Sequence, residues 1–221
     1  MLTSIGRRDI SIKNNNHDSD EENNNKTTIW SDNDIAKEIS KAYLLEPGGH
    51  HMLVYKNLNL FRQVYLNYAL TYLPQNEIVL LASQYEAIES VKNYLTAFGV
   101  NVAKHLADGT LFVIDAQQGY FTGGDTEGTL KLAFTLASRV KKEKRRGLTW
   151  LGDMGAFFGF ENIAKMMDYE LQSCPQKYED EMIKTVCCYH SEDFDRLTAS
   201  QKEALFEHHY KSFMMLGDNN I

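Results

Sequence analysis

Polar side chains of several chemical kinds follow the apolar runs of this sequence, where strands of a parallel sheet would end. They are Tyr55, Ser83 with Gln84, residues 115–118, residues 152–154, and Tyr189 with His190. In an open α/β sheet, ligands bind outside the carboxyl ends of the strands. These phenols, carboxylates, amides and imidazole could hold a small polar ligand, but they form no recognisable set of nucleophile, base and orienting group. The sequence therefore favours binding over catalysis.

The phosphate-binding motif of nucleotide hydrolases is missing from the sequence. Neither GxxxxGKS nor GxxxxGKT occurs, and residues 56–59, after the first expected strand, include no glycine to let backbone N–H groups wrap a phosphate. The run from Leu111 to Asp115 does look like the apolar strand and Asp that hold a magnesium-bound water in such enzymes. A divergent nucleotide-binding protein or ATPase that uses Asp115 and His51 is the alternative. Those two residues should lie at opposite edges of a parallel sheet, which counts against them as a catalytic pair.

Two adjacent histidine pairs, 50–51 and 208–209, raise the question of a metal site. Neighbours on a strand point to opposite faces, so only one of His50 and His51 could face a given site. No HxxxH or CxxC spacing completes a tetrahedral set, and Cys187 and Cys188 are typical of a buried strand rather than of nucleophiles. We expect no metal and no other cofactor.

A basic run, 139–146, carries six positive charges where a helix should end. Cations there complement the helix dipole and are usually solvated, which is the simplest interpretation. The alternative is a partner with an acidic face, bound through Lys142, Lys144, Arg145 and Arg146. Nucleic acid is not expected, because no aromatic residues interleave the run and the whole chain carries a net charge of −7.

The elements that would position these groups alternate regularly along the chain. Apolar runs predict strands at 51–55, 77–82, 110–115, 148–151 and 182–189, with a further strand at 210–216. Amphipathic spacing predicts helices between them, at 61–72, 85–99, 126–144, 160–171 and 200–207. Strands that are apolar on both faces and separated by helices imply a mostly parallel sheet covered on both sides. The predicted fold is a three-layer, doubly wound α/β domain.

The amino-terminal stretch differs in composition from the rest of the 221-residue chain. Residues 1–33 contain two Asn triplets around an acidic run, which predicts disorder, and 34–45 predict a short lead-in helix. We therefore expect a tail over 1–46, one domain over 47–217 and a short tail over 218–221. Three cysteines make no disulfide framework, and neither a signal segment nor a membrane span is visible. The expected location is the cytoplasm.

The order of these segments, from about His50 to Leu216, resembles the MEDS family, the sensory domain of methanogens, methylotrophs and the dichloromethane-responsive repressor. The segments that carry the resemblance are 51–55, 99–100 with 111–116, Tyr120, 152–154, Tyr169 with Glu170, and Tyr189. The chain departs from the family after Met154, where Gly155-Ala156-Phe157 stands in place of the usual Ser-Trp. The pocket wall and the ligand preference need not be shared there.

The resemblance implies a non-catalytic signal-transduction module of an archaeal or bacterial cell. Members look like derivatives of the RecA and circadian-clock ATPase fold that have lost the phosphate loop. The expected partners are an unknown small molecule and a signalling protein such as a histidine kinase or regulator. The candidate ligand-binding residues are His51, Tyr55, Asp115, Gln117, Tyr120, Asp153, Met154 and Tyr189. If Asp115 and Asp153 lie close together without a cation, their repulsion should raise one pKa.

Overall fold

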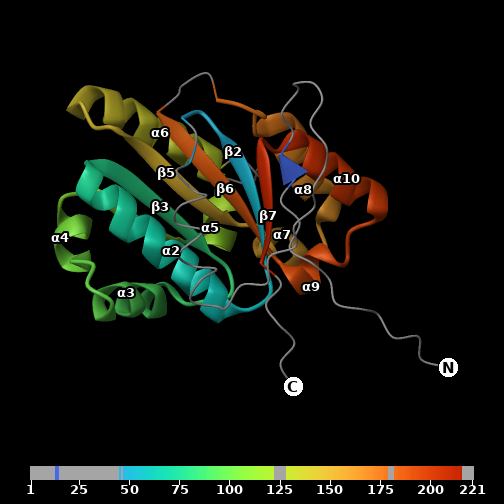
Figure 1. Cartoon of the computed structure of the whole chain (residues 1–221), viewed down its shortest axis with the longest axis horizontal. Coiled ribbons are helices and arrows are strands. Elements are labelled where there is room, and N and C mark those ends of the chain that lie inside the picture. The colour runs from blue at the N-terminus through green and yellow to red at the C-terminus, as the bar shows by residue number, and fades with distance from the viewer. Residues whose placement is uncertain (1–12, 15–44, 46, 122–127, 179–181, 216–221) are drawn as a thin grey trace, which may run out of the picture.

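The computed structural model, shown in Figure 1, describes residues 13–14, 45, 47–121, 128–178 and 182–215. Six parallel strands form the sheet: β2 (His50–Tyr55), β3 (Glu77–Ser83), β4 (Leu111–Asp115), β5 (Gly147–Asp153), β6 (Ile183–His190) and β7 (Lys211–Met215). Their spatial order is β7-β2-β6-β5-β3-β4, and the short strand β1 (Lys13–Asn14) pairs antiparallel with β7. The predicted parallel sheet is confirmed.

Helices cover both faces of this sheet. One face packs against α2 (Leu58–Tyr72), α3 (Ile88–Ala97) and α4 (Val102–Ala107). The other packs against α5 (Ala116–Phe121), α6 (Gly128–Glu143), α7 (Gly155–Gly159), α8 (Ile163–Asp168) and α10 (Ala199–His208). Side chains alternate along each strand, so that Met52 and Val54 belong to one core while Leu53 and Tyr55 belong to the other. The molecule therefore has the three layers that the sequence predicted.

Local sequence signals explain where the longer helices begin and end. The Asn57 side chain accepts a hydrogen bond from the backbone N–H of Leu60 (3.0 Å) and caps α2. After α2 comes the 3₁₀ turn η1 (Leu73–Gln75), which contains Pro74 and ends at Asn76 in the left-handed conformation (φ 64°). Thr198 and Gln201 form a reciprocal capping box at the start of α10.

Several elements differ from the sequence-based expectation. The helix expected over 160–171 begins at Ile163 in α8 and continues as a π-helical turn, η2 (Tyr169–Ser173). Four short helices were not predicted: α4, α5, α7 and α9 (Ser191–Phe194). Each is four to six residues long, too short for an apolar stripe to show a helical period. The spacing of Leu130, Phe134, Ala137 and Val140 predicts that all four lie on the apolar stripe of α6, but Phe134 is 46% exposed while the other three are buried.

Most of the predicted amino-terminal tail and the lead-in helix lie outside the described residues. Lys13 and Asn14, within the segment expected to be disordered, form β1 against β7. Leu45 is buried, and its backbone N–H donates to the Tyr72 hydroxyl (3.0 Å). Within the described ranges, none of the helices combines the length and apolar character that a membrane crossing requires.

A buried ion pair joins the amino ends of three neighbouring strands. Lys184 Nζ lies 2.5 Å from Glu77 Oε1, and the Thr149 hydroxyl donates to Glu77 Oε2 (2.8 Å). The Lys184 ammonium also lies 4.3 Å from the centre of the Tyr72 ring. Burial lowers the pKa of Lys184, and the contact with Glu77 opposes that shift. The pair thus connects β3, β5, β6 and α2.

Removing one partner of this pair should destabilise the fold strongly. We expect Lys184→Met to lower the free energy of unfolding by about 3–5 kcal/mol, because it leaves the Glu77 carboxylate buried without a cation. The double variant Glu77→Gln/Lys184→Met should recover most of that loss, since both charges are then absent. Urea unfolding of the three proteins would measure this, and equal losses in the single and double variants would contradict it.

Candidate functional site

The connections diverge at the carboxyl edge of the sheet. The chain leaves β2 and β3 toward the face covered by α2 and α3, but it leaves β5 and β6 toward the face covered by α7 and α10. Because β2 lies beside β6, and β3 lies between β5 and β4, neighbouring strands part to opposite faces at three places among the described strands, two of them between β2 and β3. Such switch points are where open α/β sheets bind ligands. The carboxyl edge between β2 and β3 is therefore the candidate site.

The Asp153 carboxylate lies at the centre of this edge and is fully buried. Its Oδ2 accepts hydrogen bonds from the Tyr55 hydroxyl and the Gln84 backbone N–H, both at 3.2 Å. Its Oδ1 accepts from the Gly155 backbone N–H at 3.0 Å. The side chain thus ties together the ends of β2, β3 and β5 and the first turn of α7.

Burial raises the pKa of Asp153 to about 6, although its three hydrogen-bond donors favour the charged form. Among neighbouring carboxylates, Asp193 adds to the rise. Asp115, which the sequence suggested for that role, is not among the causes of the shift because β3 separates it from Asp153. A carboxyl group with a pKa near 6 can lose or gain a proton close to neutral pH.

A second polar layer covers Asp153 on the outer side. The Tyr85 hydroxyl donates a hydrogen bond to Asp193 Oδ2, and Arg196 Nη1 lies 3.4 Å from Asp193 Oδ1. The His190 ring packs edge-on against Tyr55 (5.3 Å between centroids) and lies 5.5 Å from the Tyr85 ring. Tyr85 is 41% exposed, and Asp193 is nearly buried.

The space under Tyr85 depends on a glycine. A Cβ atom on Gly155 would lie only 2.5–2.8 Å from three atoms at the far end of the Tyr85 side chain. Tyr85 can therefore lie over the start of α7 only because residue 155 has no side chain.

Asp115 lies at the same edge as Asp153, in accordance with the predicted parallel order. It ends β4 opposite Ser83 of β3, while Asp153 ends β5 on the other side of β3. Asp115 Oδ1 accepts a hydrogen bond from the backbone N–H of Gln118 (2.8 Å), so it caps the short helix α5. Gln117 is exposed on that helix. These two residues lie apart from the Tyr55–Asp153 contact.

Three of the candidates belong to the core behind the edge. Tyr120, Met154 and Tyr189 are fully buried, and the Tyr120 hydroxyl donates to Met154 Sδ (3.4 Å). The Tyr120 hydroxyl would lie 2.3 Å from a Cβ on Gly152, so it packs directly against the β5 backbone. The Tyr189 hydroxyl points to Glu170 instead (2.5 Å). These phenols belong to the core covered by α7 and α8, whereas Tyr55, which donates to Asp153, belongs to the core on the other face of the sheet.

His51 lies near the other end of β2, as the sequence predicted from its place in the strand. Its Nδ1 is 3.2 Å from the Thr185 carbonyl oxygen, and its ring packs edge-on against Tyr210. Burial lowers its pKa to about 3. The structure does not bring His51 to Tyr55 or Asp153, the residues with which it was grouped.

Sequence reasoning did not assign Tyr85, Asp193 or Arg196 to the site, and it noted Gly155 only as part of a departure from the family pattern. Tyr85 directly follows Gln84 at the predicted strand end, and this position could have indicated that Tyr85 belongs to the site. Asp193 and Arg196 lie in and after α9, a helix too short to be recognised from its pattern. Their position depends on how that helix folds back over β6.

The basic run divides into structural and exposed members. Arg139 Nη1 donates to the Gly109 carbonyl (2.7 Å), and Arg145 contacts both Glu143 (2.6 Å) and Asn76 (2.9 Å). Lys142, Lys144 and Arg146 are exposed where α6 ends and β5 begins. The start of β5 lies at the amino edge of the sheet, opposite the Asp153 site.

Comparisons with known proteins identify relatives of this chain. The family model described as MEDS, MEthanogen/methylotroph, DcmR Sensory domain, matches residues 49–209. A similar solved structure is the crystal structure of an uncharacterized protein from Pyrococcus horikoshii in complex with an unknown peptide. It has a TM-score of 0.59 and 12% sequence identity, and the match covers 80% of this chain and 82% of that one. No curated protein matches.

The raised pKa of Asp153 predicts how stability varies with pH. The pKa is about 6 in the fold against an ordinary value of 3.8. The neutral form's contribution to stability is therefore complete below about pH 4 and is lost as pH rises through about 6. Relative to Asp153→Asn, which does not titrate, we expect the wild type to lose on the order of 2–3 kcal/mol over this range. Urea unfolding of both proteins from pH 4 to pH 7 measures the difference, and a difference independent of pH would contradict the assignment.

Proposed function

Because this chain belongs to the MEDS family of sensory domains, we propose that it is a non-catalytic sensory module that binds a small polar ligand at the carboxyl edge around Asp153. The observation that carries the proposal is the Tyr55–Asp153 contact beneath Tyr85 and His190. A buried carboxyl group with a pKa near 6 can accept a hydrogen bond from a ligand or donate one. This group sits at a switch point of the sheet, which supports a binding role.

The arrangement indicates how a signal could leave the site. In this proposal a ligand reaches Asp153 by displacing the Tyr85 ring, whose hydroxyl is hydrogen-bonded to Asp193 in α9. Movement of Tyr85 would release Asp193 and hence α9, which connects β6 to α10. Ligand binding would thereby change the surface formed by α9 and Arg196, where a signalling partner could bind.

The peptide in the Pyrococcus horikoshii structure suggests a related possibility, in which the bound species is a segment of a partner protein. The likeness to that structure concerns the fold, so the small ligand remains our first proposal.

Descent from a RecA-like ATPase stays a prediction. In this chain, the loop after β2, where such an ATPase would bind phosphate, contains Asn57, whose side chain caps α2. Phosphate release from ATP with magnesium that is lost in Asp115→Asn would favour the ATPase alternative.

Ligand binding can be tested with two matched glycine variants of α7. Gly155→Ala pushes the Tyr85 ring away, whereas a Cβ on Gly159 would meet only Gln84 Nε2, at 4.0 Å. A panel of small polar molecules is screened first by thermal unfolding of the wild type. A ligand at 100 times its dissociation constant should stabilise the wild type by about 2.7 kcal/mol. Because the ring is already displaced in Gly155→Ala, a tenfold tighter site should raise this to about 4.1 kcal/mol, while Gly159→Ala keeps the wild-type effect.

Two outcomes would count against the binding site. Equal ligand stabilisation in both glycine variants would place the ligand elsewhere. A binding ligand whose effect is unchanged in Tyr55→Phe and Asp153→Asn would exclude the carboxyl edge as its site. In every case, circular dichroism of the variants without ligand checks that the fold is retained.

The exposed end of α6 is proposed as a contact for an acidic partner. Lys142, Lys144 and Arg146 are exposed, although the whole chain has a net charge of −7. Arg145 is engaged with Glu143 and Asn76, so we expect it to position the segment rather than to bind.

An acidic model polypeptide, polyglutamate, tests this surface. We expect binding at low salt that weakens strongly at physiological ionic strength, because exposed charges are screened beyond about 10 Å. The variant Lys142→Glu/Arg146→Glu should lose this binding. Lys165→Glu, an exposed site on α8, is the control and should keep most of it. Polyglutamate binding that does not change with ionic strength would contradict the proposal. An equal loss of binding in Lys142→Glu/Arg146→Glu and in Lys165→Glu would contradict it as well.

A further inference from the structure

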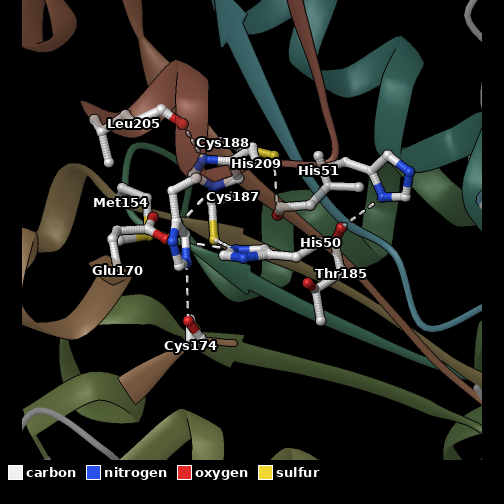
Figure 2. A network of polar contacts seen from close by, with 12 residues as sticks. His50, His51, Met154, Glu170, Cys174, Thr185, Cys187, Cys188, Leu205 and His209 are labelled. Atoms are coloured by element: carbon white, nitrogen blue, oxygen red, sulfur yellow. Dashed lines mark hydrogen bonds and ion pairs between the residues drawn. The ribbon is translucent and has the colours of Figure 1, made fainter. Parts of the chain in front are cut away.

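Four buried side chains of metal-binding type meet on the face of the sheet covered by α8 and α10 (Figure 2). His50 begins β2, Glu170 lies in η2, Cys187 lies within β6 and His209 follows α10. All four are at most 3% exposed. One ligand atom from each of them lies within 4.8 Å of every other. Four separate elements thus direct one nitrogen, oxygen or sulfur atom each to a common point.

The separations between these atoms resemble the edges of a coordination tetrahedron. His50 Nε2 lies 3.2 Å from Cys187 Sγ and 3.4 Å from Glu170 Oε2, and His209 Nε2 lies 3.5 Å from the same Oε2. Zinc binds imidazole nitrogen at about 2.0–2.1 Å and thiolate sulfur at about 2.3 Å, which places the ligand atoms of a tetrahedron about 3.3–3.6 Å apart. Three of the separations are already close to those values.

Neighbouring groups hold two of the ligand atoms toward the centre. His209 Nδ1 lies 2.7 Å from the Leu205 carbonyl oxygen, as Figure 2 shows. A carbonyl can only accept, so Nδ1 carries a proton, and Nε2, which faces the cluster, is the nitrogen left to bind a metal. The Tyr189 hydroxyl donates to Glu170 Oε1 (2.5 Å) and leaves Oε2 directed inward. Outer partners of this kind commonly orient metal ligands.

The inward-facing atoms have no hydrogen-bond partner in the described part of the chain. This is true of Glu170 Oε2 and of His209 Nε2, both completely shielded from solvent. Buried acceptors without a donor are unfavourable, and most native proteins avoid them. His50 Nδ1 is also buried without a partner among the described residues, so nothing described fixes the tautomer of that ring. A cation bound between Glu170 Oε2 and His209 Nε2, which lie 3.5 Å apart, would satisfy both acceptors.

We propose that His50, Glu170, Cys187 and His209 form a structural zinc site. Two nitrogens, one carboxylate oxygen and one thiolate are donors that suit Zn²⁺. The dication, the Glu170 carboxylate and the Cys187 thiolate sum to zero charge, which removes the penalty of burying Glu170 alone. Binding displaces the Cys187 thiol proton to solvent.

The burial and ligand number indicate a structural site rather than a catalytic one. Four protein ligands complete a tetrahedron and leave no position for water or substrate. The ion would connect β2 and β6 to η2 and to the junction between α10 and β7. This cluster is distinct from the Asp153 site and does not depend on the proposed ligand. It also differs from our expectation of no metal, which rested on sequence spacing.

Adjacent cysteines of β6 provide a matched pair of variants. Cys187 faces the cluster, whereas Cys188 is equally buried but faces the opposite core. The metal-free chain is titrated with Zn²⁺, and with Co²⁺ to observe thiolate-to-metal charge transfer. We expect one Zn²⁺ per chain in the wild type and in Cys188→Ala. Cys187→Ala should bind at least 100-fold more weakly and lose the charge-transfer band. Wild type that binds no Zn²⁺, or equal binding in the two variants, would overturn the proposal.

X-ray absorption of the zinc-loaded wild type tests the site without relying on a variant that folds. We expect one sulfur at about 2.3 Å and three nitrogen or oxygen ligands at about 2.0–2.1 Å. A first shell without sulfur would overturn the assignment of Cys187, and a shell of six oxygens would show binding at surface carboxylates instead. Glu170→Gln, which keeps the size of the side chain, should weaken Zn²⁺ binding while the circular dichroism spectrum is unchanged. Unaltered affinity in this variant would also count against the site.

Discussion

The burial of the parallel sheet on both faces is the constraint on which the rest of this structure depends. Every side chain of β2, β3 and β5 is buried, and the backbone groups of these strands are paired with their neighbours. A polar side chain in such a sheet must be paired or lie at a strand end. The Glu77–Lys184 pair meets this demand at the amino edge, and Asp153 with its three donors meets it at the carboxyl edge.

Strand β6 links the polar centres of the molecule. Lys184 contributes to the ion pair, and Cys187 faces the proposed zinc cluster. Cys188 pairs in the sheet with Asp153, and its carbonyl accepts from the Met154 backbone N–H (2.8 Å). His190 ends the strand against Tyr55. Because successive side chains alternate between faces, one strand serves separate polar groups without bringing them into contact.

This arrangement separates a rigid part of the domain from a part that can respond. The proposed zinc cluster is enclosed by the core and would hold α10 and η2 to the sheet. The Asp153 site lies under Tyr85, a partly exposed side chain held by Asp193 in the short helix α9. Side chains with few buried contacts reorganise at lower free energy than the core does. In the proposed sensory role, a signal from Asp153 would reach the surface through α9.

The sequence by itself determined the fold class and the edge at which Tyr55, Asp115 and Asp153 lie. Apolar runs separated by amphipathic helices predict a parallel sheet covered on both faces, and the last residues of each run mark the carboxyl edge of that sheet. Only the tertiary structure decided which of these residues meet. Tyr55 and Asp153 do, because the strand order places β6 alone between β2 and β5, whereas Asp115 caps α5 beyond β3. The four residues of the metal cluster share no sequence spacing. Their convergence depends on helix ends and side-chain directions, which a one-dimensional pattern does not encode.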